Sequence, residues 1–326
     1  MRDIAVVCGA GGFIGNYLVN RLKSDGYWVR GVDVRFPAHG ETAADDYLLL
    51  DLQDPIDCAR ALRIGNYSPK EVYQLAGKMG GIEFIESEEY SVLTTNALIN
   101  LNMISAAATA HVSRYFFPSS VAVYRDMSRM EPELREDSAY PAMPDNDFGW
   151  EKLFSERVVS AFQKRFGANT RIGRFQNCYG PGNEWKGGRE NSLAALCRKI
   201  ALANDGDTIN VFGNGTAVRN FVFVEDAVDA IIAIMRSDVG APVNIGTCEY
   251  ITINELVQVI AKIAGKTIKP RFTGGPTGVQ YRRFSSEQIE ALGWKAKTSL
   301  QEGIRLTYDW IRLEALEEAR RQISDI

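Results

Sequence analysis

The chain has 326 residues, 45% of them hydrophobic, and its 37 basic and 41 acidic side chains leave a formal net charge of −4. This length is enough to bury a large core and to form one large or two interleaved domains. The weakly acidic balance gives no electrostatic reason to expect nucleic acid or an anionic membrane surface as a partner.

The cysteine and apolar patterns bear on location and metal binding. Five scattered cysteines form no CxxC pair, and only His39 and His111 could join them, so we expect reduced thiols and no metal site. The glycine-broken N-terminus does not resemble a signal peptide, and no apolar run is long enough to span a bilayer. These features predict a cytoplasmic protein without membrane segments.

Strands and helices are predicted to alternate through the first half of the chain. In chain order we expect strands at 4–8, 28–32, 47–50, 71–75, 114–118 and 170–174, with helices at 13–24, 90–110 and 150–166. This alternation is typical of an α/β fold of the Rossmann type, in which helices cover both faces of a doubly wound parallel sheet.

The second half differs from Cys178 onward, where loops rich in Gly, Asn and Pro separate the predicted elements. We expect helices at 192–203, 226–235, 253–264 and 300–312, and strands at 220–224 and 243–246. The predicted organisation is a cofactor-binding Rossmann domain over 1–175, with returning segments near 219–246. A smaller, mixed substrate-binding lobe over 176–326 is interleaved with it.

A glycine pattern follows the first strand and opens the first helix. Its residues are Gly9, Gly12, Phe13, Ile14 and Gly15. The first glycine permits a tight turn, the second lets the backbone approach a pyrophosphate, and the third lets the helix pack on the strand. Asp33, which ends the second strand, would accept the ribose hydroxyls and repel a 2′-phosphate. The pattern therefore predicts NAD as the cofactor.

Two further strand ends would line the same cofactor. Asp51 and Leu52 end the third strand, where a hydrogen bond to the adenine edge is expected. Leu75, Ala76 and Gly77 follow the fourth strand and would lie along the cofactor. Both assignments depend on the glycine pattern.

These motifs, in this order, resemble the extended short-chain dehydrogenase/reductase superfamily over nearly the whole chain. The resemblance also includes Ser119-Ser120 with Tyr124, an aromatic residue one helical turn before Lys152, and the segment NCYGPG from Asn177. It implies a nucleotide-sugar epimerase, dehydratase or decarboxylase that keeps NAD bound throughout its cycle.

A narrower set of segments looks like the GDP-mannose 3,5-epimerase family. The segments are KMGGIEFI at 78–85, RIGRF at 171–175, WKGGRE at 185–190, RNFVFVED at 219–226 and GVQYR at 278–282. The resemblance implies a nucleotide-diphosphate sugar as substrate, with a GDP-sugar favoured over a UDP-sugar. It implies these substrate-binding residues: Gly81, Ser119, Ser120, Asn177, Lys186, Arg189, Arg219 and Arg282. Arginines suit the diphosphate because their forked donors match phosphate oxygens.

The catalytic residues of this family are a tyrosine that takes the proton of the sugar C4 hydroxyl, a lysine one turn later, and a serine that shares the hydrogen bond. Ser120 and Lys152 hold the places of the serine and the lysine, and Phe148 stands in place of the tyrosine. For inversion at C3 and C5 the family uses a cysteine and a lysine. Lys186 holds the lysine's place, whereas Ala122 stands in place of the cysteine.

Phenylalanine neither accepts nor donates a proton, so we expect impaired oxidation. Three explanations stay open. The first, which we prefer because the surrounding motif is intact, is that Phe148 is an engineered substitution. The second is that the natural protein binds NAD and a nucleotide sugar without turnover. The third is that another group transfers the proton, although no histidine lies near the motif.

The expected function is an NAD-dependent epimerase that acts through a transient 4-keto sugar. A UDP- or GDP-sugar 4-epimerase, or a related 4-keto-sugar enzyme, is the alternative enzyme, and an inactive nucleotide-sugar and NAD-binding protein is the alternative of another class. The helix at 90–110 carries more apolar residues than one core face can use, which favours a homodimer.

Overall fold

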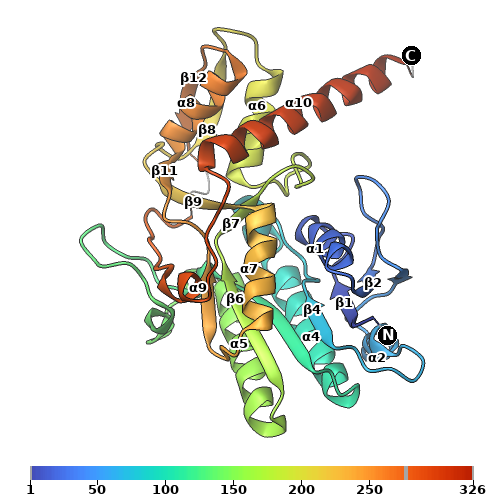
Figure 1. Ribbon diagram of the computed structural model, residues 1–326. Helices are drawn as coiled ribbons and strands as arrows, with labels where there is room; N and C mark the ends of the chain where they lie inside the picture. Colours follow the sequence, from blue (N-terminus) through green and yellow to red (C-terminus); the bar gives the residue numbers. More distant parts are fainter. Residues whose placement is uncertain (1, 275–277, 325–326) are drawn as a thin grey trace.

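The computed structural model describes residues 2–274 and 278–324. Seven parallel strands form its central sheet, in the spatial order β10-β6-β5-β4-β1-β2-β3 (Figure 1). The strands are β1 Ile4–Cys8, β2 Trp28–Asp33, β3 Asp46–Leu49, β4 Glu71–Gln74, β5 Arg114–Ser120, β6 Asn169–Phe175 and β10 Pro242–Ile245. The chain reverses its direction of travel across the sheet between β1 and β4, and open α/β sheets bind ligands at such a switch point.

Helices cover both faces of this sheet. On one face lie α1 (Phe13–Ser24) and α7 (Val224–Arg236), which pack with Ala5 and Val7 of β1. On the other face lie α2 (Pro55–Leu62), α4 (Glu89–Thr109) and α5 (Asp147–Phe166), which pack near Val6 and Cys8. Because alternate β1 side chains enter two separate cores, the strand reads as one continuous apolar run. The predicted fold class, an α/β fold of the Rossmann type with a doubly wound parallel sheet, is confirmed.

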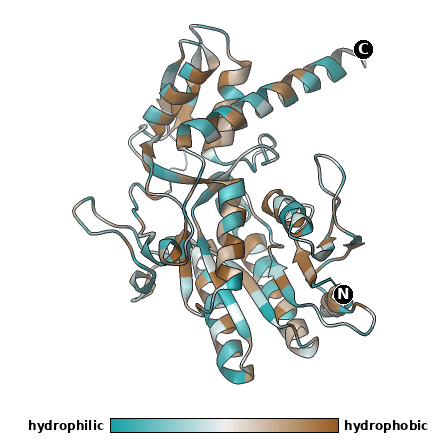
Figure 2. Cartoon of the chain, viewed as in Figure 1, coloured by the Kyte–Doolittle hydropathy of each residue, from teal (hydrophilic) through white to brown (hydrophobic). Residues whose placement is uncertain are grey.

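A second group of elements stands above the sheet in Figure 1. It contains a three-stranded sheet β11-β9-β7 and a two-stranded sheet β12-β8. Its strands are β7 Asn177–Tyr179, β8 Thr208–Phe212, β9 Val218–Phe223, β11 Tyr250–Thr252 and β12 Lys269–Thr273. Its helices are α6 Ser192–Leu202, α8 Ile253–Ala264 and α10 Leu300–Ser324, which share one core cluster. The far part of α10 projects from the molecule and alternates between teal and brown along its length (Figures 1 and 2).

Several predicted boundaries shift, and several short elements were missed. Helix α5 begins before the predicted residue 150, because Asn146 caps it by accepting the Gly149 N–H at 2.9 Å. Helix α10 continues well beyond the predicted end at 312. Strand β10 returns to the large sheet, whereas β9 belongs to the three-stranded sheet. The prediction missed β7, β8, β11, β12, α2, the short helices α3 (Ile82–Ser87) and α9 (Glu287–Ala291), and the 3₁₀ turns η1 (Val121–Val123) and η2 (Glu136–Ala139).

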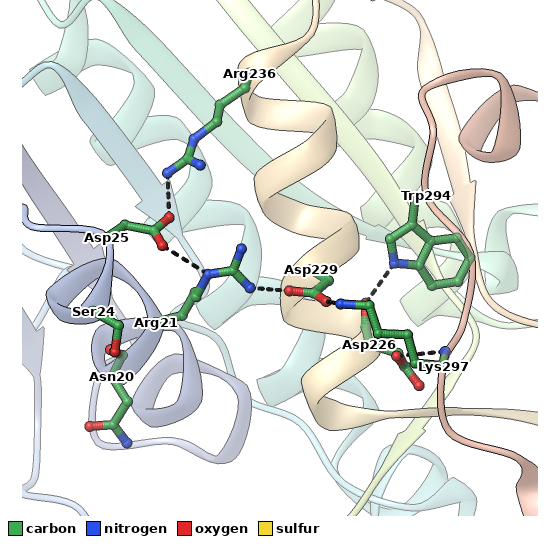
Figure 3. A network of polar contacts seen from close by, with 9 residues as sticks. All are labelled: Asn20, Arg21, Ser24, Asp25, Asp226, Asp229, Arg236, Trp294 and Lys297. Carbon is green, nitrogen blue, oxygen red and sulfur yellow. Dashed lines mark hydrogen bonds and ion pairs between the residues drawn. The ribbon is translucent and has the colours of Figure 1, made fainter.

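Polar contacts join the first helix to the C-terminal part of the chain (Figure 3). Arg21 on α1 pairs with Asp229 on α7, and Asp229 also accepts from Lys297 Nζ at 2.6 Å. Buried Asp226 on α7 accepts the Lys297 N–H at 2.9 Å, and its carbonyl oxygen accepts from Trp294 Nε1 at 2.9 Å. The segment that leads into α10 is therefore held against α7, and α7 against α1.

Candidate active site

The glycine turn lies at the switch point of the sheet. Gly9 has a φ of +80°, and a Cβ built on it would stand 2.7 Å from the backbone nitrogen of Ala76, at the end of β4. A Cβ on Gly15 would stand 2.0 Å from the Gly9 carbonyl oxygen, so helix α1 can approach β1 only without a side chain there. Gly12 caps α1 without a side-chain hydrogen bond. The first turn of α1 then contributes two half-buried side chains, Phe13 and Ile14.

The Asp33 carboxylate is held at the tip of this turn. Its Oδ2 accepts the Gly11 N–H at 3.0 Å, and its Oδ1 accepts the Arg35 N–H at 3.2 Å. A carboxylate accepts about four hydrogen bonds, so capacity remains for two ribose hydroxyls. The Arg35 guanidinium pairs with the Glu184 carboxylate at 3.1 Å. The residues of the turn therefore fit the adenosine side of NAD.

The remaining residues predicted to line the cofactor lie at the ends of β3 and β4. Asp51 is exposed, and its Oδ1 accepts the Gln53 N–H at 3.0 Å, whereas the Leu52 side chain is buried in the core. Leu75 and Ala76 are half-buried and Gly77 is exposed. These positions border the switch point, and their contact with the cofactor stays a prediction.

The turn after β5 packs directly on the first turn of α5. A Cβ built on Gly149 would stand 2.3 Å from the Ala122 carbonyl oxygen, so only glycine allows this approach. Ser120, half-buried at the end of β5, accepts the Ala122 N–H at 3.1 Å. The structure thus brings Ser120 and Ala122 to the end of α5 that carries Phe148.

Phe148 and Lys152 share a face of α5, as their spacing predicts. The Lys152 ammonium lies 5.5 Å from the centre of the Phe148 ring and 5.2 Å from that of Phe117. Both Phe148 and Lys152 are buried. A cation over an aromatic face is worth up to about 2 kcal/mol when desolvated, so the pair is physically reasonable without a hydroxyl. The Phe148 ring of this pair has no group that could take a proton from a substrate.

The two serines of the predicted site differ in orientation. Ser119 is buried, and its hydroxyl donates to Glu156 Oε1 at 2.5 Å. Glu156 forms a buried ion pair with Arg174, whose Nη2 lies 2.7 Å from Oε2. Ser119 therefore supports the core network of α5 and β6, and its contact with substrate stays a prediction. Ser120, by contrast, is half-buried.

Tyr124 extends this network into the core. Its hydroxyl donates to Asn244 Oδ1 at 2.6 Å and accepts from Arg174 Nη1 at 2.8 Å. Burial raises the pKa of Tyr124 above its ordinary value, although the Arg174 charge opposes the shift. The tyrosine is therefore a neutral structural group. Asn244 and Arg174 bond to the tyrosine directly, and Glu156 holds Arg174. Arg174 lies in the RIGRF segment noted in the sequence, whereas Glu156 and Asn244 were not predicted.

Two of the predicted phosphate-binding arginines lie close together. Arg282 donates from Nη2 to Asp145 Oδ1 at 2.8 Å, and Arg219 donates from Nη1 to the Val279 carbonyl oxygen at 2.7 Å. Burial, followed by the charge of Arg282, lowers the pKa of Arg219. The two guanidinium groups therefore lie within electrostatic range of each other, and the Asp145 carboxylate balances one of the two charges.

The WKGGRE segment packs on the 79–84 segment. Arg189 donates to the Met79 carbonyl oxygen from Nε at 3.0 Å and from Nη2 at 2.6 Å, and its guanidinium lies 4.8 Å from the Phe84 ring centre. Gly81 donates its N–H to the Arg189 carbonyl oxygen at 2.9 Å, and a Cβ on Gly81 would meet Glu190 at 2.4 Å. Arg189 thus fixes one segment on the other.

Two other predicted substrate residues have partners on distant elements. Lys186 is exposed, and its ammonium donates to Glu318 on α10 at 2.5 Å. Asn177 is exposed and donates to the Asn220 carbonyl oxygen at 3.0 Å. The Lys186 ammonium is therefore directed towards α10, and its catalytic role stays a prediction.

Metal-binding clusters and membrane spans are both absent from residues 2–274 and 278–324. This part of the chain contains no group of three or more His, Cys, Asp or Glu side chains that could hold a metal ion. Across the same ranges, none of the helices combines the length and hydropathy needed to cross a bilayer.

The reversed strand order, the glycine turn and the acidic end of β2 define a dinucleotide-binding protein of the Rossmann type. The sequence model described as the NAD dependent epimerase/dehydratase family matches residues 5–246. The chain belongs to this family, whose cofactor is NAD.

Comparisons with individual proteins agree with this assignment. The chain is 36% identical to GDP-mannose 3,5-epimerase 1 of Oryza sativa subsp. indica over 98% of its own length and 84% of the relative's. It is 35% identical to GDP-mannose 3,5-epimerase of Arabidopsis thaliana, over 98% of this chain and 85% of that relative. Among solved structures it is similar to the UDP-glucose 4-epimerase of Thermus thermophilus in complex with NAD. That match has a TM-score of 0.83 and 25% identity, and covers 95% of this chain and 99% of the other.

Proposed function

We propose that the protein is an NAD-dependent nucleotide-sugar epimerase of the GDP-mannose 3,5-epimerase type, which acts through a transient 4-keto sugar and is impaired by Phe148. The observation that carries the proposal is the pairing of Phe148 with Lys152 on the turn of α5 that packs on Ala122. The 36% identity to a curated GDP-mannose 3,5-epimerase over 98% of the chain supports the substrate class.

The proposed roles are those that the resemblance to the GDP-mannose 3,5-epimerase family implies for each residue. NAD, when bound, supplies the acceptor for the hydride of the sugar C4. Ser120 orients the C4 oxygen by a hydrogen bond, and Lys152 meets the cofactor ribose and supplies a fixed positive charge. Phe148 fills the place of the proton acceptor without performing its task. Lys186 would act on C3 or C5 after exchanging Glu318 for the substrate.

The proposed substrate is a GDP-sugar in preference to a UDP-sugar. Arg219 and Arg282 would meet its diphosphate, since the charge of Arg282 reaches Arg219 and the forked donors of arginine match phosphate oxygens. Arg189 would complete the substrate side by holding the 185–190 segment against the 79–84 segment.

One observation favours a second enzyme. Ala122 supplies no acid or base, and inversion at C4 alone requires none at C3 or C5. A 4-epimerase acting on a UDP- or GDP-sugar is therefore the alternative, supported by the likeness to the Thermus thermophilus enzyme. The third candidate, a protein that binds NAD and a nucleotide sugar without turnover, is favoured by Phe148 itself.

One experiment separates the three candidates. The Phe148→Tyr variant is incubated with GDP-mannose or UDP-glucose and NAD in deuterated water, and the sugar is analysed by mass spectrometry and NMR. A 3,5-epimerase incorporates solvent deuterium at C3 or C5, whereas a 4-epimerase yields the C4 epimer without deuterium. Binding of both ligands without any new sugar identifies the binding protein and rejects both enzymes.

We also propose a cytoplasmic homodimer. The support is a set of exposed apolar side chains on neighbouring helices α4 and α5: Leu98, Leu101, Trp150 and Phe154. Their spacings of three and four residues place each pair on one helix face. Within each subunit, we propose that the sheet unit (1–175 with the returning elements α7 and β10) binds NAD, and that the remainder of the lobe at 176–326, with β9, binds the nucleotide sugar. Limited proteolysis with and without each ligand tests this division.

A further inference from the structure

Lys152 is a buried cation with one carboxylate beside it. Its side chain is 9% exposed, and its ammonium lies 5.5 Å from the ring centre of Phe148 and 5.2 Å from that of Phe117. Within the described residues its ion-pair partner is Glu151, whose Oε2 lies 3.8 Å from Nζ. The Glu151 side chain is only 1% exposed. A charge buried at this depth strongly affects the electrostatics of whatever binds near Lys152.

The Glu151 carboxylate is held by groups from two helices, and a third element, β4, supports one of them. Its Oε1 accepts from Asn100 Nδ2 on α4 at 2.9 Å and from Ser155 Oγ on α5 at 2.7 Å. Asn100 Oδ1 in turn accepts from Gln74 Nε2 on β4 at 3.3 Å, and that amide also donates to the Ala76 carbonyl oxygen at 2.9 Å. The network therefore runs from the predicted cofactor-lining segment to Glu151.

One oxygen of this carboxylate lacks a hydrogen bond. Glu151 Oε2 is buried and finds no hydrogen-bond partner in the described part of the chain. Buried carboxylate oxygens are normally satisfied, so an unpaired one calls for a reason. Oε1 is held by two donors, and Oε2 lies 3.8 Å from the Lys152 ammonium. At that distance Oε2 acts on the ammonium by its charge.

We propose that Glu151 is a positioning residue that offsets the charge of Lys152 and so keeps the affinity of the site for oxidised NAD close to that for the reduced form. The oxidised nicotinamide carries a positive charge that the reduced ring lacks. An ammonium beside it disfavours the oxidised form, and a carboxylate fixed behind the ammonium opposes that effect. An enzyme that takes a hydride and returns it needs both forms to be held. The inference rests on the proposed function, because it takes Lys152 as the residue that meets the cofactor.

The test is the affinity of Glu151→Gln for NAD and for NADH, measured by calorimetry and NADH fluorescence after bound nucleotide has been removed. The substitution keeps the shape of the side chain and removes its charge. We expect the ratio of the dissociation constants, NAD over NADH, to rise about tenfold, as for charges about 10 Å apart in a partly desolvated site. An unchanged ratio, or an equal loss of affinity for both forms, overturns the proposal.

Two further variants separate charge from packing. Ser155→Ala removes one donor to Glu151 without changing any charge, so the ratio should stay within about twofold of the parent. Glu151→Asp keeps the charge but withdraws it from Lys152, so the ratio should rise about threefold. If Glu151→Gln does not fold, the ratio measured for Glu151→Asp decides whether the charge of Glu151 sets the relative affinity for NAD and NADH. A shift in Ser155→Ala as large as in Glu151→Gln assigns the effect to packing and overturns the proposal.

The same titrations distinguish this inference from the proposed function. A parent chain that binds neither NAD nor NADH overturns the cofactor site and this inference together. A parent that binds both, with a ratio that ignores Glu151→Gln, overturns the inference alone.

Discussion

Gly149 touches the carbonyl oxygen of Ala122 so closely that a Cβ on the glycine would stand 2.3 Å from that oxygen. The obstacle is backbone, so neither partner can move aside cheaply. Alanine in a helix normally stabilises a protein by about 0.5–1 kcal/mol relative to glycine. We expect the opposite sign here: Gly149→Ala should lower the free energy of unfolding and displace the Ser120–Ala122 turn. Urea denaturation measures the first effect. Gly274→Ala, where a Cβ meets no atom within 4 Å, is the control; equal stability of Gly149→Ala and the parent would contradict the close contact.

Phe148→Tyr should create hydride transfer. Lys152 already lies on the same helix face, so the added phenol hydroxyl is the missing proton acceptor. General acid–base catalysis by one group is typically worth about 10²–10⁴-fold. A phenol with an ordinary pKa of about 10 titrates lower beside an ammonium, so the rate should rise from neutral to mildly alkaline pH. NADH absorbance and product analysis follow the reaction. Phe154→Tyr, on the exposed side of the same helix, should leave the rate of hydride transfer at the level of the parent. Normal binding of both ligands without turnover favours the binding-protein alternative.

Arg282→Ala should weaken nucleotide-sugar binding and leave NAD binding intact. The charge of Arg282 reaches Arg219, and we propose that the two guanidinium groups together meet the diphosphate. The loss of a charged hydrogen bond is worth about 1.5–3 kcal/mol, which corresponds to about 10–150-fold in the dissociation constant. Calorimetric titration with GDP-mannose and with NAD measures the two dissociation constants. Arg305→Ala, on exposed α10, serves as the control. If GDP-mannose binds the Arg282→Ala variant as tightly as the parent, Arg282 is only the ion-pair partner of Asp145.

Phe154→Glu should convert the proposed dimer into a folded monomer. Phe154 is 49% exposed on α5, beside Trp150 at 46%, and the exposed Leu98 lies on neighbouring α4. A charge in a buried apolar interface is costly because it has no partner there. Light scattering gives the mass, and circular dichroism checks the fold. Leu202→Glu, at an exposed position at the end of α6, should leave the mass unchanged. A parent chain that is monomeric at micromolar concentration rejects the dimer outright.

The buried pair of Glu156 and Arg174 should show strong non-additivity. Glu156→Ala leaves the Arg174 guanidinium buried without its counter-charge, which costs about 3–5 kcal/mol of stability. Replacement of both residues, as Glu156→Leu with Arg174→Met, should cost less than the single change because no charge is stranded. Urea denaturation compares the two. Glu302→Ala breaks only an exposed pair with Arg305 and should have little effect. A double variant that is less stable than the single one would show that the hydrogen bonds of Arg174, rather than its charge pairing, dominate.

The features that the sequence alone determined are local ones. Gly9, Gly15 and Asp33 could be assigned to a dinucleotide turn because the geometry of a strand, a tight turn and a helix start depends on residues close in the chain. The shared face of Phe148 and Lys152 follows from helical periodicity in the same way. The alternation of strands and helices was sufficient to predict the doubly wound sheet, since long periodic segments seldom have another stable arrangement.

Only the tertiary structure decided which side chains face one another across elements. The orientation of Ser119 depends on Glu156, 37 residues away, and the placement of Glu151 depends on Asn100, 51 residues away. Lys186 meets Glu318 across 132 residues, on a part of α10 that lies beyond its predicted end. Such contacts are set by how whole elements pack, and the periodicity of one segment carries no information about the partner it will meet. The charge environment of Lys152 could therefore be read only after the fold had brought α4, α5 and β4 together.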